Sequence, residues 1–246
     1  MSGHNKWSTI KRKKGANDAK RGKIFTKIIK EIIISAKEGG GDPETNARVR
    51  LAIQNAKGAN MPKDNIERAI KKAVGSDSDN YVETSFEGYG PGGIAVFTEC
   101  LTDNNNRTVA SVRAAYNKHG GKLGTNGSLS SFFDRKGVFT ISKEATTPDD
   151  LELELIDAGA QEFEEDDEIL TITCDIVDFG NVNRKLNELG IEPEDAGLKR
   201  IPNITKTLDI ESARKLMKFI EVLEDDDDVQ NVYHNLEITD ELANEL

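Results

Sequence analysis

The apolar residues of segment 17–38 recur at three- and four-residue spacing, which places them on one face of an α-helix. They are Ile24, Phe25, Ile28, Ile29, Ile32, Ile33 and Ala36. Five lysines fall nearly opposite this stripe at about 100° per residue: Lys20, Lys23, Lys27, Lys30 and Lys37. We therefore predict a helix that buries its aliphatic face and presents a row of lysines to solvent.

Two further helices complete a small helical domain. The glycine run 39–41 ends the first helix, and Asp42-Pro43 supplies a capping acid and a first-turn proline for a second helix reaching about Lys57. A turn at 59–62 precedes a third helix that stops at Gly75. The polar run that follows predicts a domain boundary.

The rest of the chain mixes strand and helix patterns. Strands are predicted at 81–87 and 94–101, a helix at 105–118 and a glycine-rich loop at 120–127. A run of six elements follows in the βαββαβ order of a ferredoxin-like domain: strand 137–142, helix 148–158, strands 160–164 and 168–174, helix 178–189 and strand 196–201. The last predicted elements are a short strand near 205–208, a helix at 210–223 and a strand at 229–236.

These patterns predict an α+β multidomain fold: an N-terminal three-helix domain followed by two α/β-sandwich domains. The last helix and strand have no complete layer of their own, so we expect them to pair with the unit at 81–119. The ferredoxin-like βαββαβ domain is then an insertion in a discontinuous middle domain. The predicted domains are a basic helical domain at 1–79, the middle domain at 80–134 plus 204–246, and the inserted domain at 135–203.

The charge of the chain changes sign along its length. Its net charge is -11, but residues 1–75 hold 18 Lys and Arg against 7 Asp and Glu, while residues 76–246 hold 15 against 37. Clustered cations neutralise phosphates and release counterions, which supplies most of the free energy of nucleic-acid binding. A basic segment attached to an acidic body therefore indicates a protein that binds a polyanion through one region.

The candidate contacts lie in this basic segment. A tryptophan among the first lysines is suited to stacking on an unpaired base, and the turn at 60–63 is either a plain helix connection or a contact. A solvated helix face is the alternative explanation of the lysine row. The candidate nucleic-acid-binding residues are Lys6, Trp7, Lys11, Arg12, Lys13, Lys14, Lys20, Arg21, Lys23, Lys27, Lys30, Met61, Pro62 and Lys63.

Signals of catalysis or of a cofactor are weak. Gly88, Gly90 and Gly93 match a dinucleotide fingerprint in spacing, but a strand pattern follows them where that site needs a helix, so we predict a hairpin loop. The three histidines are scattered, and the acidic run 224–228 lacks the spacing of a calcium loop, so we interpret it as a solvated turn. We expect no enzyme activity, no metal and no cofactor.

Two polar features stay open. Arg107, beside helix-capping residues, is either structural or an anion ligand, and Lys122, in the glycine-rich segment, either approaches a phosphate or belongs to a simple turn. Cys100 and Cys174 lie in separate strand patterns, which favours buried thiols in a reducing compartment. Without a membrane-spanning or secretory pattern, we expect a cytoplasmic protein with neither membrane nor small-molecule partners.

Several long motifs resemble the YebC/PmpR family. They are Gly3-His4-Asn5-Lys6-Trp7, the run from Asp18 to Lys27, the run from Ala59 to Ile66, Glu87-Gly88-Tyr89-Gly90-Pro91-Gly92-Gly93, the run from Leu101 to Thr108, Gly120-Gly121-Lys122-Leu123-Gly124 and Phe132-Phe133. The resemblance covers the whole chain and is densest in its first 135 residues. It implies an N-terminal helical domain followed by two α/β domains.

The resemblance also implies a function. Members are described as cytoplasmic DNA-binding transcription regulators, and the mitochondrial translational activator of cytochrome c oxidase belongs to the same family. Some bacterial relatives are described as ribosome-associated factors that assist synthesis of proline-rich stretches. We therefore expect a non-enzymatic, nucleic-acid-binding regulator of gene expression, most simply a DNA-binding transcriptional regulator. The alternative is a translation factor that binds ribosomal RNA, with the ribosome as its partner.

Overall fold

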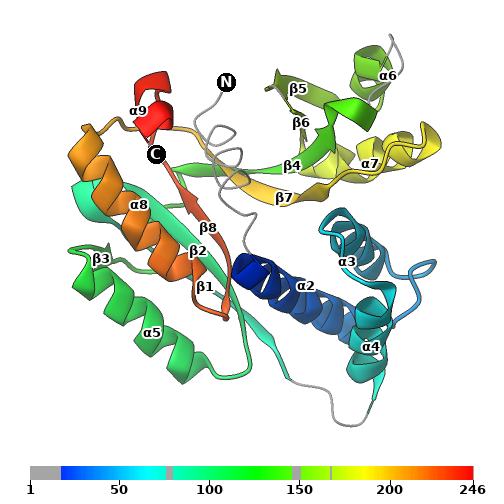
Figure 1. Cartoon of the computed structure of the whole chain (residues 1–246), viewed down its shortest axis with the longest axis horizontal. Coiled ribbons are helices and arrows are strands. Elements are labelled where there is room, and N and C mark those ends of the chain that lie inside the picture. Colours follow the sequence, from blue (N-terminus) through cyan, green and yellow to red (C-terminus); the bar gives the residue numbers. More distant parts are fainter. Residues whose placement is uncertain (1–17, 76–79, 146–150, 167, 246) are drawn as a thin grey trace. The chain divides into compact units, whose positions relative to one another are not determined.

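The computed structural model describes residues 18–75, 80–145, 151–166 and 168–245 (Figure 1). The chain divides into two compact units, each built around one sheet. Among the described residues, the first-sheet unit comprises 18–34, 80–134 and 201–245, and the second-sheet unit comprises 35–75, 135–145, 151–166 and 168–200.

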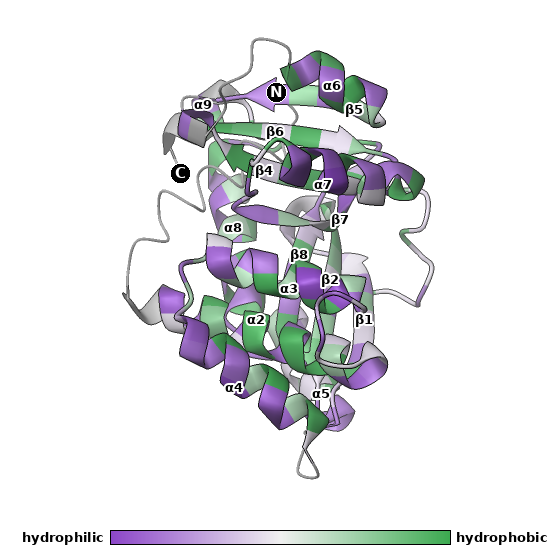
Figure 2. Cartoon of the chain, turned by 90° about the vertical axis from the view of Figure 1, so that its right-hand side faces the viewer, coloured by the Kyte–Doolittle hydropathy of each residue, from purple (hydrophilic) through white to green (hydrophobic). Residues whose placement is uncertain are grey.

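The predicted N-terminal helices are present as α2 (Asp18–Gly39), α3 (Ala47–Gly58) and α4 (Lys63–Val74). The predicted start of the second helix at Asp42-Pro43 is wrong, because Asn46 is the N-cap of α3. The Asn46 side chain accepts hydrogen bonds from the backbone amides of Arg48 and Val49 and donates to the carbonyl of Ser35. Figure 2 shows hydrophobic and hydrophilic residues alternating along α4, as expected of a helix with one buried face.

The first sheet has the strand order β3-β1-β2-β8, with antiparallel neighbours throughout. Pairing of the last strand with β2 confirms that the C-terminal segment completes the layer begun at residue 82. The strands are β1 (Val82–Tyr89), β2 (Ala95–Thr102), β3 (Lys122–Leu123) and β8 (Val229–His234), and a 3-10 turn, η1 (Pro91–Gly93), joins the first two.

Helices α5 (Asn105–Lys118) and α8 (Ile210–Glu224) cover one face of this sheet (Figure 1). Their apolar sides form the larger core of the unit, in which the fully buried rings of Tyr116 and Phe219 lie edge to face with centroids 4.8 Å apart. A smaller cluster lies on the opposite face of the sheet and consists of Ala95, Phe97, Leu129, Phe133 and Tyr233.

The second sheet confirms the predicted ferredoxin-like element order, with strands arranged β5-β6-β4-β7. Helices α6 and α7 pack on it around Phe139, Leu155 and Leu186. The elements are β4 (Phe133–Ser142), η2 (Lys143–Ala145), α6 (Leu151–Asp157), β5 (Ala160–Glu165), β6 (Ile169–Cys174), η3 (Ile176–Asp178), α7 (Phe179–Glu188) and β7 (Asp195–Pro202).

Helix α3 packs against this second sheet. Leu51 contacts its core, and the Asn55 amide both donates to and accepts from the backbone of Ala196 at 2.8 and 2.9 Å. A Cβ on Gly58 would lie 2.0 Å from the carbonyl oxygen of Glu194, so only glycine permits this approach. The helix is therefore fixed to the edge of β7.

Two sequence expectations near the C-terminus differ from the structure. The short strand near 205–208 is reduced to one isolated bridge between Lys206 and Leu236, and a helix not predicted, α9 (Asp240–Glu245), follows. The predicted fold class is confirmed: a helical N-terminal region followed by two antiparallel sheets. The division into three domains stays a prediction.

Candidate nucleic-acid interface

The predicted binding residues differ in how the structure places them. Lys6, Trp7, Lys11, Arg12, Lys13 and Lys14 lie outside the described residues. Lys20 lies in the first turn of α2, and Arg21 follows it with an exposed side chain.

Lys23 and Lys27 bind the C-terminal end of α8 within the first-sheet unit. The Lys23 ammonium donates to the Asp225 carboxylate at 2.7 Å, and the Lys27 ammonium donates to the carbonyl oxygen of Glu224 at 2.9 Å. Glu224 is the last residue of α8, where unsatisfied carbonyls give the helix a partial negative charge. Two cations of the predicted row thus already have hydrogen-bond acceptors in the protein.

Lys30, a predicted contact residue, is buried within the first-sheet unit rather than presented on its surface. Its ammonium donates to the Asp228 carboxylate at 2.9 Å and to the carbonyl oxygens of Asp227 and Leu101 at 2.7 and 3.3 Å. It also lies 5.4 Å from the centre of the Tyr81 ring. A buried ammonium must be hydrogen-bonded to offset its lost hydration, and these contacts meet that need.

Asp228 is the centre of this network, and the interpretation of run 224–228 as merely a solvated turn is wrong at this residue. Its carboxylate is 4% exposed and accepts from Lys30, Arg107, Thr102 and Thr108. Burial alone raises the pKa of a carboxyl, but the hydrogen bonds from Lys30, Arg107 and Thr108 outweigh it and lower the pKa of Asp228 to about 2. The acid therefore stays ionised at neutral pH.

Arg107, left open by the sequence, has structural partners. Its guanidinium donates to both oxygens of Asp228 at 2.7 and 2.9 Å and to Asp103 at 2.7 Å. The hydrogen bonds that the guanidinium donates to these two carboxylates raise the pKa of Arg107 above its ordinary value. Arg107 thus joins the start of α5 to the turn before β8.

Of the three candidate residues in the turn between α3 and α4, two are exposed and one is buried. Met61 is 5% exposed, so its side chain belongs to the buried interior, as expected of a plain helix connection. Pro62 and Lys63 are exposed, and the Lys63 ammonium lies 3.4 Å from the Glu67 carboxylate. Asn60 supports the turn with a left-handed backbone at φ 56°.

Helices α3 and α4 expose further cations that the sequence reasoning did not select. They follow the polar faces of the two helices, and their periodic spacing was the available signal. Two acids, Asp64 and Glu67, lie among them on α4, so the surface is moderately basic. These further exposed cations are Arg50, Lys57, Arg68, Lys71 and Lys72.

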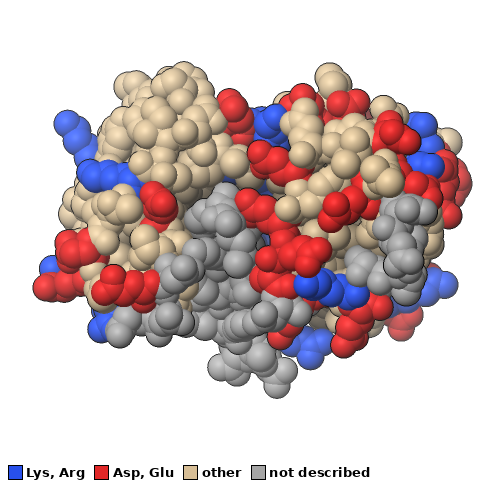
Figure 3. Space-filling model, turned by 90° about the horizontal axis from the view of Figure 1, so that it is seen from above, with Lys and Arg blue, Asp and Glu red and all other residues tan. Residues whose placement is uncertain are grey.

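The acidic side of the charge division is visible at the surface. Figure 3 shows Asp and Glu side chains spread across the face that it presents, with basic side chains between them. Such an acidic surface repels polyanions.

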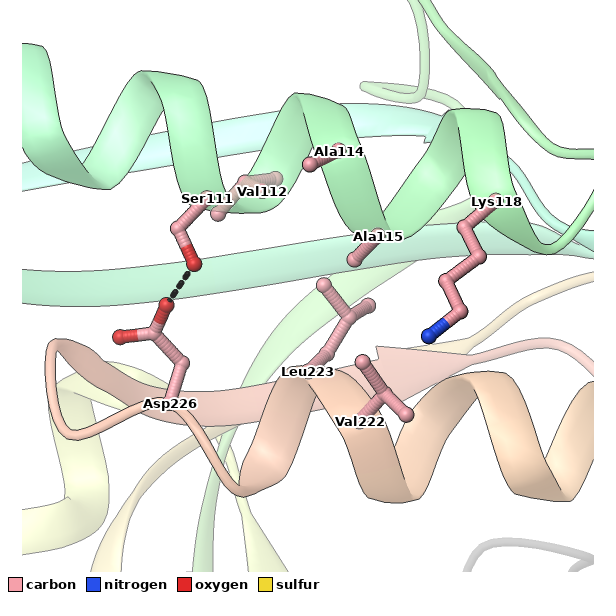
Figure 4. A pocket seen from close by; sticks show the side chains of 8 residues that line it. All are labelled: Ser111, Val112, Ala114, Ala115, Lys118, Val222, Leu223 and Asp226. Atoms are coloured by element: carbon pink, nitrogen blue, oxygen red, sulfur yellow. Dashed lines mark hydrogen bonds between the residues drawn. The ribbon is translucent and has the colours of Figure 1, made fainter.

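The described residues of the first-sheet unit form a groove on its helical side. This groove of about 210 Å³ between α5 and α8 is mostly apolar, with Lys118 at one end and a hydrogen bond between Ser111 and Asp226 at the other (Figure 4). No group of three or more His, Cys, Asp or Glu side chains in the described segments is arranged to hold a metal ion. None of the helices in those segments combines the length and apolarity needed to cross a membrane.

The remaining weak signals have structural explanations. The predicted hairpin loop is confirmed, since Gly88 lies at the end of β1, and residues 90–94, which include η1, connect β1 to β2. Cys100 and Cys174 are buried free thiols, and burial raises their pKa values to about 12 and about 11. Neither thiol is therefore ionised at neutral pH.

Comparisons with known proteins cover almost the whole chain. Residues 5–76 match the family domain described as the TACO1/YebC protein N-terminal domain, and residues 81–236 match the TACO1/YebC second and third domain. A "probable transcriptional regulatory protein" of Geotalea uraniireducens is 52% identical over 242 residues, covering 98% of each chain. One of Treponema denticola is 51% identical over 239 residues, covering 97% of each chain.

A solved structure is also similar. The crystal structure of a conserved hypothetical protein, Aq1575 from Aquifex aeolicus, superposes with a TM-score of 0.81 at 41% sequence identity. It covers 89% of this chain and 91% of that one.

Proposed function

The chain belongs to the TACO1/YebC family of regulatory proteins, and from that premise we propose that it is a non-enzymatic, cytoplasmic nucleic-acid-binding regulator of gene expression. Relatives named transcriptional regulatory proteins support duplex DNA as its target. The observation that carries the proposal is the charge division: 18 cations against 7 acids in residues 1–75, followed by 15 against 37 in the remainder.

Some cations of the basic segment already have partners within the chain. Lys23, Lys27 and Lys30 already bind the end of α8 and the turn after it. We therefore assign phosphate contact chiefly to the N-terminal run, to Lys20 and Arg21, and to exposed cations of α3 and α4. The assigned residues are Lys6, Lys11, Arg12, Lys13, Lys14, Lys20, Arg21, Arg50, Lys57, Lys63, Arg68, Lys71 and Lys72.

Salt titration of duplex-DNA binding tests this proposal. Changing Lys11, Arg12, Lys13 and Lys14 together to Ala removes about four phosphate contacts, so the slope of log K against log salt should become shallower by roughly 3.6. The matched control is a fourfold Ala variant of exposed cations on α5 and α8: Lys118, Arg214, Lys215 and Lys218. An unchanged slope in the first variant, or an equal change in both, would remove the N-terminal run from the mechanism.

Ribosomal RNA is the second candidate target, and Trp7 favours it. A tryptophan among lysines suits folded RNA with unpaired bases better than a closed duplex, because stacking requires an accessible base. Sedimentation of cell extract through sucrose, with and without RNase, separates the two targets. The translation role is supported if the protein co-migrates with ribosomes and if both RNase treatment and the fourfold N-terminal variant abolish this co-migration. The transcription role is supported if the protein is bound only to DNA.

A further inference from the structure

A cationic segment without acids lies within the acidic part of the chain. Residues 104–133 contain four Lys and Arg and no Asp or Glu, whereas residues 76–246 as a whole hold 37 acids. The segment includes the glycine-rich motif around Lys122, for which the proposed function gives no role. In an otherwise acidic body, such a stretch marks a surface that does not repel anions.

Glycines bring Lys122 beside Tyr89. The two residues are directly paired between β1 and β3, so their side chains project from the same side of the sheet. A Cβ on Gly88 would lie 2.6 Å from the carbonyl oxygen of Lys122, and one on Gly121 would lie 2.9 Å from that of Tyr89. Both motifs therefore need glycine at these positions for the strands to approach.

Tyr89 keeps an accessible ring. Its side chain lies edge to face against Phe132, with ring centroids 6.2 Å apart and planes at 79°, yet 37% of the residue remains exposed. Lys122 is exposed as well, and within the described part of the chain its ammonium forms no ion pair. An aromatic ring held in place by a neighbour and paired with an unengaged cation is thus available to a ligand.

A buried carboxylate holds the adjacent loop in place. Glu87 is 6% exposed and accepts hydrogen bonds from the backbone amides of Gly127 and Leu129, each at 2.7 Å. Leu129 is buried beneath the loop, whereas Thr125 and Asn126 at its tip are exposed. The loop therefore presents hydroxyl and amide groups in a preformed arrangement, which lowers the entropy cost of binding.

We propose that Tyr89, Lys122 and the loop 124–128 form a second nucleic-acid contact, which binds an unpaired nucleotide of a single strand. The base stacks on the Tyr89 ring, the Lys122 ammonium pairs with the adjoining phosphate, and Asn126 hydrogen-bonds to base or sugar. A closed duplex offers no free base face, so this surface distinguishes single strands from duplexes. The inference rests on the proposed function and adds a site outside the basic helical segment.

Binding of a fluorescently labelled oligo(U) of about 12 nucleotides, a length within the usual range of single-strand sites, tests the inference. Tyr89→Leu keeps an apolar contact for Phe132 but removes the stacking ring, and it should weaken oligo(U) binding about tenfold. Tyr89→Trp, which keeps an aromatic ring at this position, should bind oligo(U) about as well as the unaltered chain. Lys122→Gln should make the salt slope for oligo(U) shallower by about 0.7, the value for one phosphate on a single strand.

Three controls separate this site from the fold and from the N-terminal run. Lys118→Gln changes another exposed lysine of the same acid-free segment and should leave oligo(U) binding as in the unaltered chain. Duplex-DNA binding should be equal in the unaltered chain and Tyr89→Leu. Unfolding curves of Tyr89→Leu and Tyr89→Trp confirm that both variants are folded.

The outcomes distinguish the two proposals. The second contact is overturned if Tyr89→Leu leaves oligo(U) binding unchanged, or if the unaltered chain does not bind oligo(U). An acidic peptide would then be the remaining ligand for this surface. An equal loss of duplex and single-strand binding in Tyr89→Leu also overturns the second contact. If the unaltered chain binds neither duplex DNA nor single strands, the proposed function itself is overturned.

Discussion

The Lys30 ammonium lies 2.9 Å from the Asp228 carboxylate, and both side chains are more than nine-tenths buried. The two residues are 198 positions apart, so this contact joins α2 to the turn that precedes β8. A lysine that the sequence pattern places in a solvent-facing row is therefore a structural group of the first-sheet unit. Four predictions follow from this network and from the similarly buried Glu87.

Asp228→Asn should lower the free energy of unfolding by about 3 kcal/mol, because it leaves the buried Lys30 without a compensating charge. Chemical denaturation in urea measures the change. Asp225→Asn is the matched control, since its partner Lys23 is 41% exposed and a surface ion pair contributes at most about 1 kcal/mol. Equal losses in the two variants would contradict a special role for the buried pair.

The stabilisation by ionised Asp228 should decrease as the pH falls. The pKa of Asp228 is about 2 in the folded chain against an ordinary 3.8, so the unfolded chain takes up the proton first as pH falls. The contribution is complete above pH 3.8 and is lost towards pH 2, a difference of roughly 2 kcal/mol. Urea unfolding at several pH values should show the gap between the unaltered chain and Asp228→Asn narrowing over this interval. If the difference in unfolding free energy between the two chains does not vary with pH, the ionised form of Asp228 is not the source of the stabilisation.

Lys30→Met should separate stability from binding. Removing the ammonium leaves Asp228 buried with one cation fewer, and we expect a loss of about 3 kcal/mol in unfolding free energy. The slope of duplex-DNA binding against salt should not change, because the buried ammonium contacts no phosphate. Lys63→Ala is the counterpart: its 86% exposed side chain should alter the slope by about 0.9 and stability by less than about 0.5 kcal/mol. A shallower slope in Lys30→Met would restore Lys30 to the interface.

Glu87→Ala should loosen the loop that carries Asn126. Two buried backbone amides lose a charged acceptor, which should cost about 2 kcal/mol of unfolding free energy. Hydrogen exchange at Gly127 and Leu129 should accelerate by more than the global loss of stability explains. Glu83→Ala, an exposed position on the same strand, should leave exchange at both amides unchanged. Unaltered protection in Glu87→Ala would show that the loop is held by other contacts.

Regular elements were predictable from the chain because local pattern determines them. The βαββαβ order and α5 emerged from periodicity and capping residues, and α5 begins and ends at the expected residues, Asn105 and Lys118. The start of α3 was not predictable in this way. Asp42-Pro43 has the local chemistry of a helix start, but Asn46 prevails because its amide also bonds the carbonyls of Ser35 and Gly40, a tertiary contact.

The candidate site was harder to predict for the same reason. Charge and helical spacing describe which side of α2 is polar, but not what that side meets in the folded chain. Lys30 is buried because it contacts the turn before β8, which is 198 positions away in the sequence, and Met61 is buried as well. Conversely, the pairing of Tyr89 with Lys122 depends on a two-residue strand that is too short to give a periodic signal.

The strand order of the first sheet has a consequence for synthesis of the chain. The inner strand β2 pairs on one side with β1, its neighbour in sequence, and on the other with β8, more than a hundred residues later. While the chain emerges from the ribosome, the free edge of β2 remains open until that last strand arrives, and an open edge is a template for wrong pairing. The intervening second sheet has all four of its strands by then. A chain that ends before residue 229 would therefore contain all strands of the second sheet, but in the first sheet one edge of β2 would stay unpaired and prone to pair with other chains.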